Sequence, residues 1–127
     1  MPEKLGSDFR DLNVWKVCRD LRIMIWKLCK RFPSEEKFRL TDQMVRASRS
    51  STSNIAEGHG RFHFQENIQF CRQSRGSLFE LIDHTMVAEE CEYISIEEKE
   101  ELIEHIVSAI RLLNGYIKYL KGRKNNE

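Results

Sequence analysis

Proline and glycine are scarce in this chain, with two prolines and six glycines among 127 residues. This composition excludes collagen-like and low-complexity proteins, because both depend on frequent glycine or proline. No run of about 18 apolar residues is free of charge, so no membrane span is expected. Met1–Phe9 contains acidic residues and no apolar stretch, which argues against a secretory signal peptide. We therefore expect a cytoplasmic protein without a membrane partner.

An excess of charge of one sign is also absent. The 21 Lys and Arg residues nearly cancel the 20 Asp and Glu residues, which leaves a net charge of +1. Bulk charge therefore indicates neither a disordered tail nor a strongly basic nucleic-acid-binding protein. Hydrophobic residues make up 40% of the chain, enough for one core. We expect a single domain over residues 1–127.

The residues of common catalytic and metal sites lack the necessary spacing. The four cysteines form no CxxC pair, and we expect buried, inert thiols at Cys18, Cys29, Cys71 and Cys91. His59 and His63 are separated by Gly60, which disfavours a helical metal-binding pair. No Gly-x-Ser-x-Gly motif provides a nucleophile. The sequence predicts no enzyme, no metal and no cofactor.

Apolar residues recur every three or four positions, as in amphipathic helices. The pattern predicts helices over residues 11–32, 35–57, 64–93 and 96–120, followed by a polar tail over 121–127. Pro33 should end the first helix, and Ser34 should cap the second. No segment alternates with a period of two. Four helices with short connections predict an all-α, elongated, antiparallel up-and-down four-helix bundle.

The serine-rich segment 47–54 (ASRSSTSN) is the ambiguous part of the pattern. Its helix propensity is low and its composition resembles a linker. Small and apolar residues nevertheless continue in helical register through it, and Gly58 and Gly60 provide a natural end. We interpret the segment as helix.

A polar stripe with helical spacing crosses this segment and continues on the third predicted helix. We interpret it as a network between helices that fixes the register of the bundle, with a ligand or partner groove and a solvated face as alternatives. Its members are Gln43, Arg46, Ser50, Asn54, Glu57, Arg61, Ser77 and Glu80.

Basic and acidic residues are unevenly distributed along the chain. Residues 1–80 carry 15 basic and 10 acidic side chains, and residues 81–127 carry 6 and 10. In an antiparallel bundle, several basic residues near the start of the third helix and the end of the fourth would share one end. This cluster is either a nucleic-acid-binding patch or an ordinary solvated face. Its members are Arg61, Arg72, Lys118, Lys121, Arg123 and Lys124.

Two tryptophans, Trp15 and Trp26, lie beside the apolar stripe of the first predicted helix. Tryptophan is unusual on the surface of a monomer and common in interface cores. We therefore predict that both residues contribute to an interface between subunits.

Several segments together resemble one known family, the four helix bundle proteins, also called 23S rRNA intervening-sequence proteins. The resemblance covers roughly Leu12 to Leu120, and SNIAEG followed by the GSLxEL pattern is its most specific part. Val45, the Ser51–Thr52 pair and Ser74 depart from the family pattern, which usually has a basic residue, Ile-Pro and alanine there. The segments are Leu12–Trp15, Phe32–Pro33 with Glu36 and Phe38, Gln43–Ala47, Ser53–Gly58, Arg61 and Gly76–Leu81.

The resemblance implies a bundle that assembles into a ring-like homopentamer, without an established catalytic activity. It also implies RNA, or an RNA–protein complex, as the partner. The alternative is a protein-binding scaffold, including an accessory role for a reverse transcriptase as in diversity-generating retroelements.

Overall fold

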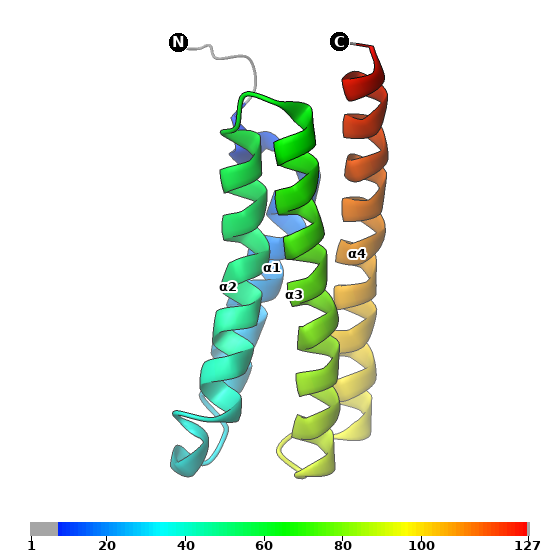
Figure 1. Ribbon diagram of the computed structural model, residues 1–127. Coiled ribbons are helices and arrows are strands. Elements are labelled where there is room, and N and C mark those ends of the chain that lie inside the picture. The colour runs from blue at the N-terminus through cyan, green and yellow to red at the C-terminus, as the bar shows by residue number, and fades with distance from the viewer. Residues whose placement is uncertain (1–7, 127) are drawn as a thin grey trace.

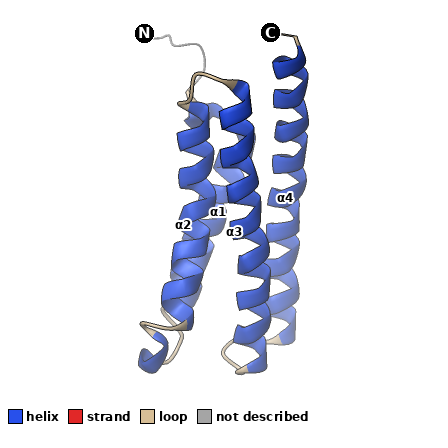
Figure 2. Ribbon diagram, in the orientation of Figure 1, coloured by secondary structure: helices blue, strands red, loops and turns tan. Residues whose placement is uncertain are grey.

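The computed structural model describes residues 8–126 and contains four long helices within them (Figure 1, Figure 2). A short 3₁₀ helix, η1 (Phe9–Asp11), precedes α1 (Asn13–Cys29), and a second, η2 (Ser34–Glu36), precedes α2 (Leu40–His59). α3 (Phe64–Glu90) and α4 (Ile96–Asn125) complete the chain. No strand occurs in the described residues, so the all-α prediction is confirmed.

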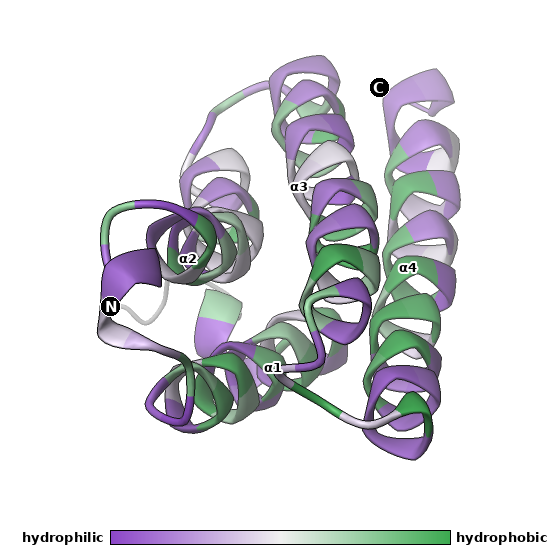
Figure 3. Ribbon diagram, turned by 90° about the horizontal axis from the view of Figure 1, so that it is seen from below, coloured by the Kyte–Doolittle hydropathy of each residue, from purple (hydrophilic) through white to green (hydrophobic). Residues whose placement is uncertain are grey.

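Consecutive helices run in opposite directions and lie beside one another (Figure 1). The closest packing is between α2 and α3, followed by α3 against α4 and α1 against α2, and α1 also meets α4. Viewed along the bundle, the hydrophobic sides of the helices turn toward each other (Figure 3). The predicted bundle-like arrangement is therefore confirmed.

The core takes at least one aliphatic residue from nearly every turn of each helix. Burying a Leu, Ile or Met side chain contributes about 1.5–3 kcal/mol, so these positions supply most of the favourable free energy of folding. The largest fully buried aliphatic side chains are Leu21, Ile25, Met44, Ile55, Ile68, Leu78, Leu81, Ile106, Leu113 and Leu120.

The serine-rich segment is helical and lies inside α2, as predicted. Its hydroxyls hydrogen-bond to carbonyls one turn earlier, for example from Ser51 Oγ to the Ser48 carbonyl at 2.7 Å. Small side chains let α3 come close, and the buried Ser74 hydroxyl donates to the Ser51 carbonyl at 2.8 Å. The segment is therefore a close-packing surface for α3 and not a linker.

The second helix begins at Leu40 and not near residue 35, so the predicted boundary and the Ser34 cap are wrong. Ser34 lies in η2, and the backbone of Arg39 (φ −123°, ψ −110°) is not helical. The Glu36 carboxylate accepts the Leu40 N–H at 3.2 Å and the Tyr93 hydroxyl at 2.6 Å. A side chain that is also bonded to the α3–α4 loop thus sets the start of α2.

The other helix ends also differ from the predicted bounds. α1 ends at Cys29 and α3 at Glu90, whereas α4 continues to Asn125 and includes most of the predicted polar tail. Basic side chains near a helix C-terminus favour this extension, because they complement the helix dipole. At the start of α4, Ser95 and Glu98 form a capping box. Among residues 8–126, no helix has the length and hydrophobicity needed to cross a membrane.

Candidate nucleic-acid interface

The charged members of the predicted polar stripe are exposed and pair locally. Arg46 Nη1 lies 3.7 Å from Asp42 Oδ2, one turn earlier in α2. Glu80 Oε2 lies 3.0 Å from His84 Nε2 in α3. Gln43 is also exposed. These charges therefore contact groups within their own helix and not across the α2–α3 boundary.

One hydroxyl pair in the stripe does join the two helices. Ser77 Oγ donates to Ser50 Oγ at 2.9 Å, and Asn54 Nδ2 donates to the same Ser50 hydroxyl at 2.9 Å. Glu57 instead pairs with Arg61, one turn later, at 3.0 Å. Of the polar network expected between the helices, the bond from Ser77 to Ser50 joins α2 and α3 within residues 8–126, while the charged members of the stripe pair within their own helix or through Arg61 in the α2–α3 loop.

The two tryptophans have different surroundings. Trp15 is 9% exposed, and its ring packs edge-to-face on Phe9 with 5.4 Å between centroids. It belongs to the core of its own chain, which corrects its assignment to a subunit interface. Trp26 is 48% exposed, and the Arg49 guanidinium lies 5.6 Å from its ring centroid. Only Trp26 of the pair therefore presents a large apolar surface to solvent.

Five of the six predicted basic residues gather at one end of the bundle. Arg61 lies in the α2–α3 loop, and the other four lie in the last turns of α4, which come to the same end as this loop (Figure 1). The Lys124 ammonium lies 2.5 Å from Gln65 Oε1 at the start of α3. We call this surface the basic end; it consists of Arg61, Lys118, Lys121, Arg123 and Lys124.

Arg72 is the exception among the predicted basic residues. It is exposed on α3, about two turns from the start of that helix. Arg75 Nη1 donates to Asn114 Oδ1 at 2.7 Å, which marks the register of α3 against α4. In this register Arg72 lies about level with Lys118, the member of the basic end that is farthest from the C-terminus of α4.

Charge changes sign along α4. Its first ten residues include five glutamates, whereas the rest of the helix contains five basic residues and no acidic one. Acidic groups near an N-terminus and basic groups near a C-terminus both complement the helix dipole. As a result, all the charged residues in the C-terminal half of α4 are basic.

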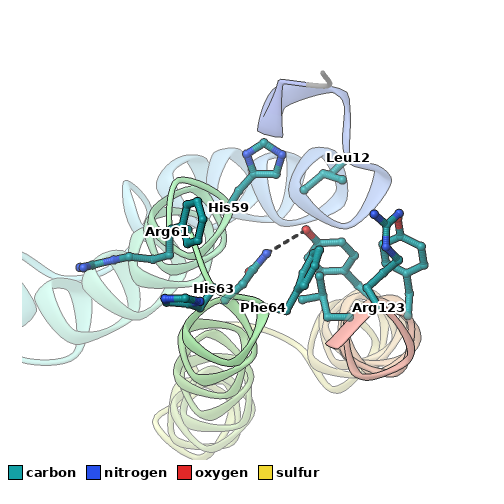
Figure 4. Close-up of a pocket in the computed structure, with 11 residues that line it drawn as sticks. Leu12, His59, Arg61, His63, Phe64 and Arg123 are labelled. Atoms are coloured by element: carbon teal, nitrogen blue, oxygen red, sulfur yellow. Dashed lines mark hydrogen bonds between the residues drawn. The ribbon is translucent and has the colours of Figure 1, made fainter. Parts of the chain in front are cut away.

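A cavity of about 480 Å³ opens at the basic end, between the α2–α3 loop, the start of α1 and the last turns of α4 (Figure 4). Its lining contains no carboxylate. It does contain two arginines, two histidines and four aromatic rings. The lining residues are Leu12, His59, Arg61, Phe62, His63, Phe64, Asn67, Tyr116, Tyr119, Leu120 and Arg123.

Aromatic rings and one arginine are held together on one side of this cavity. The rings of Tyr116 and Tyr119 are nearly parallel, with 17° between their planes and 6.2 Å between centroids. The Arg123 guanidinium lies 5.5 Å from the centroid of the Phe64 ring, and its Nη1 donates to the Tyr119 hydroxyl at 3.3 Å. Cationic and aromatic groups thus adjoin at the cavity wall.

The inner part of the cavity is polar. Asn67 is buried, and its Nδ2 donates to the Tyr116 hydroxyl at 3.4 Å. Burial is the main cause of the raised pKa of Tyr116, so this phenol keeps its proton at neutral pH. A buried amide and a phenol therefore supply hydrogen-bonding groups next to the ring faces.

The opposite end of the bundle carries acidic residues that make structural contacts. The Arg31 guanidinium and Glu98 carboxylate are 2.5 Å apart, and this bond, with the Ser95 N–H, lowers the pKa of Glu98 to about 2. The bond from Tyr93 to Glu36 raises the pKa of the tyrosine to about 12. These groups join helix ends and do not form an acidic cleft.

Three of the four cysteines are buried, as expected. Cys91 is exposed after the end of α3, so the prediction of a buried thiol is wrong at this position. Burial raises the pKa of Cys18 and Cys29 to about 11 and that of Cys71 to about 12. These three thiols are therefore protonated at neutral pH. Within residues 8–126, no three His, Cys, Asp or Glu side chains converge on a metal site.

Sequence reasoning missed the aromatic part of the cavity. Phe62 and Phe64 flank His63 directly after Arg61, and Tyr116 and Tyr119 are three residues apart on α4. An aromatic-rich loop beside a basic residue and a helical tyrosine pair are the available signals. The sequence did not show that the two would meet, because this depends on the register of α3 against α4.

One solved structure similar to the chain is a crystal structure, at 1.70 Å resolution, of a protein of unknown function from the S23 ribosomal protein family of Bacteroides thetaiotaomicron. The two chains are 23% identical and superpose with a TM-score of 0.76. The similarity covers 83% of this chain and 95% of the other. At this identity the comparison establishes the fold alone.

Among curated proteins, none matches this chain significantly. A family model does match, over residues 10–115, and it describes the 23S rRNA-intervening sequence protein. This match spans most of the chain, including all of α1, α2 and α3 and much of α4. The chain belongs to the 23S rRNA-intervening sequence protein family.

Proposed function

We propose that this chain is a non-catalytic RNA-binding protein that takes RNA at the basic end and acts as a homo-oligomer, a ring-like pentamer. Family membership supports RNA as the class of ligand, because the family is named for proteins associated with insertions in 23S rRNA. The basic end supplies the contact surface.

The observation that carries this proposal is the joining of cationic and aromatic groups at one end of the bundle. Lys118, Lys121 and Lys124 are exposed there, and no acidic residue of α4 lies after Glu104. Lysines attract phosphates, and aromatic faces stack with unpaired bases. A surface that combines both suits single-stranded or looped RNA.

Oligomerisation would multiply this surface. Trp26 and Ile23 on α1 are both more than 40% exposed, an unusual amount for such large apolar residues on one helix. Burial of this side of α1 between subunits would remove the apolar area from water. Repetition of the basic end around a ring would then raise the apparent affinity for RNA through multivalency.

The test is the salt dependence of RNA binding by a variant in which Lys118, Lys121 and Lys124 are replaced by glutamine. Each phosphate contact to a single strand contributes about 0.7 to the slope of log K against log salt. Loss of three contacts should therefore reduce the slope by about 2. Affinity measured by fluorescence anisotropy between roughly 50 and 200 mM salt gives the slope.

A charge-matched control removes three lysines from the opposite end: Lys27, Lys30 and Lys37. All three are exposed. Replacing them with glutamine changes the net charge by the same amount as in the test variant. The control should bind RNA with nearly the wild-type slope. Equal losses in both variants, or wild-type protein that does not bind RNA at low salt, would contradict the proposed function.

A further inference from the structure

We infer that the cavity at the basic end is a binding site for one unpaired nucleotide, with its base against the tyrosine pair and its phosphate at Arg123. The inference deepens the proposed function, and it rests on that function for RNA as the source of the nucleotide. A free nucleoside 5′-monophosphate offers the same chemistry, and the experiment below separates the two sources.

The composition of the cavity wall selects the class of ligand. A volume of about 480 Å³ falls in the range of small-molecule sites, roughly 300–1,000 Å³. Two arginines and two histidines line it without a carboxylate, which favours an anion. Four aromatic side chains line it too, which favours a flat ring. An anionic ligand with a flat, polar ring is a nucleotide.

The phosphate position follows from the environments of the two arginines. Arg61 is already engaged, since its guanidinium lies 3.0 Å from Glu57 and 4.0 Å from Glu66. Arg123 makes no ion pair with a carboxylate of residues 8–126. Its contacts are the Phe64 ring and the Tyr119 hydroxyl. The charge of Arg123 therefore remains uncompensated within this part of the chain.

The base position follows from Tyr119 and Asn67. Tyr119 is 55% exposed and nearly parallel to Tyr116, so it offers a ring face on which a base can stack. Asn67 is 94% buried. Within residues 8–126, its amide nitrogen donates one long hydrogen bond to Tyr116, and its Oδ1 accepts from the Cys71 thiol at 3.6 Å. Asn67 Oδ1 also lies against Gly58, whereas the amide nitrogen is directed toward Tyr116 at the cavity wall. The second N–H of this amide can donate to an acceptor on the edge of a base.

The test measures binding of five probes by isothermal titration calorimetry: adenosine 5′-monophosphate, adenosine, inorganic phosphate, and a short single-stranded RNA with and without a 5′-phosphate. The variants are Tyr119→Ala and Arg123→Gln. Loss of a stacking ring should weaken binding at least about five-fold. The controls are Phe79→Ala, whose ring is equally exposed at 55% on α3, and Arg111→Gln on α4.

A site open to the free nucleotide should bind the monophosphate more tightly than adenosine or phosphate. This binding should be lost in both variants and retained in both controls. Binding restricted to the RNA, and weakened by the same variants, supports a site for a nucleotide within RNA. The inference is overturned if the variants bind every probe like wild-type protein. RNA binding that depends on the three lysines but not on Tyr119 would overturn this inference alone and leave the proposed function intact.

Discussion

Gly58 occupies a point where α2 and α3 approach closely beside the cavity. A Cβ atom at this position would lie 2.7 Å from Asn67 Oδ1 and 2.9 Å from Phe70 Cβ. The second atom is next to the backbone and cannot swing away as the tip of a long side chain would. The absence of a side chain at Gly58 therefore allows Asn67 to occupy its buried position under the tyrosine pair.

Replacing Gly58 with alanine should lower the free energy of unfolding by about 1–3 kcal/mol, because the new methyl group forces α2 and α3 apart. Urea denaturation followed by circular dichroism measures the change. The matched control is Gly76→Ala in α3, where no atom lies within 4 Å of the added Cβ. That variant should gain about 0.5–1 kcal/mol from helix propensity. Equal urea midpoints for the two variants would show that α2 and α3 are not tightly packed at Gly58.

At the scale of helices, the four periodic segments and the serine-rich part of α2 could be predicted because apolar spacing continues through them. The start of α2 could not, because it depends on Glu36 binding Tyr93 from a distant part of the chain. Which members of the polar stripe lie between helices could not be predicted for a related reason. Its spacing places Arg46 and Glu80 on faces with other polar residues, but spacing does not tell a buried face from an exposed one.

Because α3 packs on small side chains of α2, a larger side chain at Ser51 should strongly destabilise the fold. Ser51 is fully buried, and its carbonyl accepts a hydrogen bond from Ser74. Ser51→Leu should lower the free energy of unfolding by about 3 kcal/mol or more, because overpacking separates the helices. Ser53→Leu, at an exposed position two residues on, is the control and should change stability by less than about 0.5 kcal/mol. Similar thermal midpoints for the two variants would refute close packing.

The contact between Arg31 and Glu98 predicts a pH-dependent contribution at the junction of α1 and α4. The pKa of Glu98 falls from 4.5 to about 2 on folding, so the ionised group stabilises the fold above its unfolded pKa. This contribution is lost as the pH falls through the folded value. Glu98→Gln keeps a capping residue and should be destabilised at neutral pH by less than about 1 kcal/mol, because the pair is exposed.

Urea titrations of wild type and Glu98→Gln between neutral pH and pH of about 2 check this expectation. The two midpoints should converge as the solution becomes acidic. A constant difference across the range would show that the charge of Glu98 contributes nothing.

At the scale of the whole molecule, the exposed part of α1 predicts assembly. The proposed pentamer would sediment at about five times the mass of the 15.1 kDa chain. Trp26→Ala should shift it toward smaller species, because the proposed interface would lose a large apolar anchor. Phe62→Ala, at an exposed residue of the α2–α3 loop, is the control and should keep the wild-type mass. Unchanged sedimentation of the Trp26 variant would show that this part of α1 does not lie in a subunit interface.

The charge pattern of the molecule could be predicted only in part. The division between a basic and an acidic end follows from the sequence and the antiparallel order of the helices. The cavity does not, because Phe62, Phe64, Tyr116 and Tyr119 come together only through the register that places Arg75 opposite Asn114. The function proposed for the basic end therefore depends on that register.

Ultraviolet cross-linking of a short single-stranded RNA, followed by mass spectrometry of the attached peptides, shows where RNA contacts the protein. We expect attachment at the aromatic residues of the basic end, above all at Tyr116 and Tyr119. Phe38 and Tyr93, at the opposite end of the bundle, provide an internal control. Attachment there, with none in the tyrosine pair, would contradict an RNA site at the basic end.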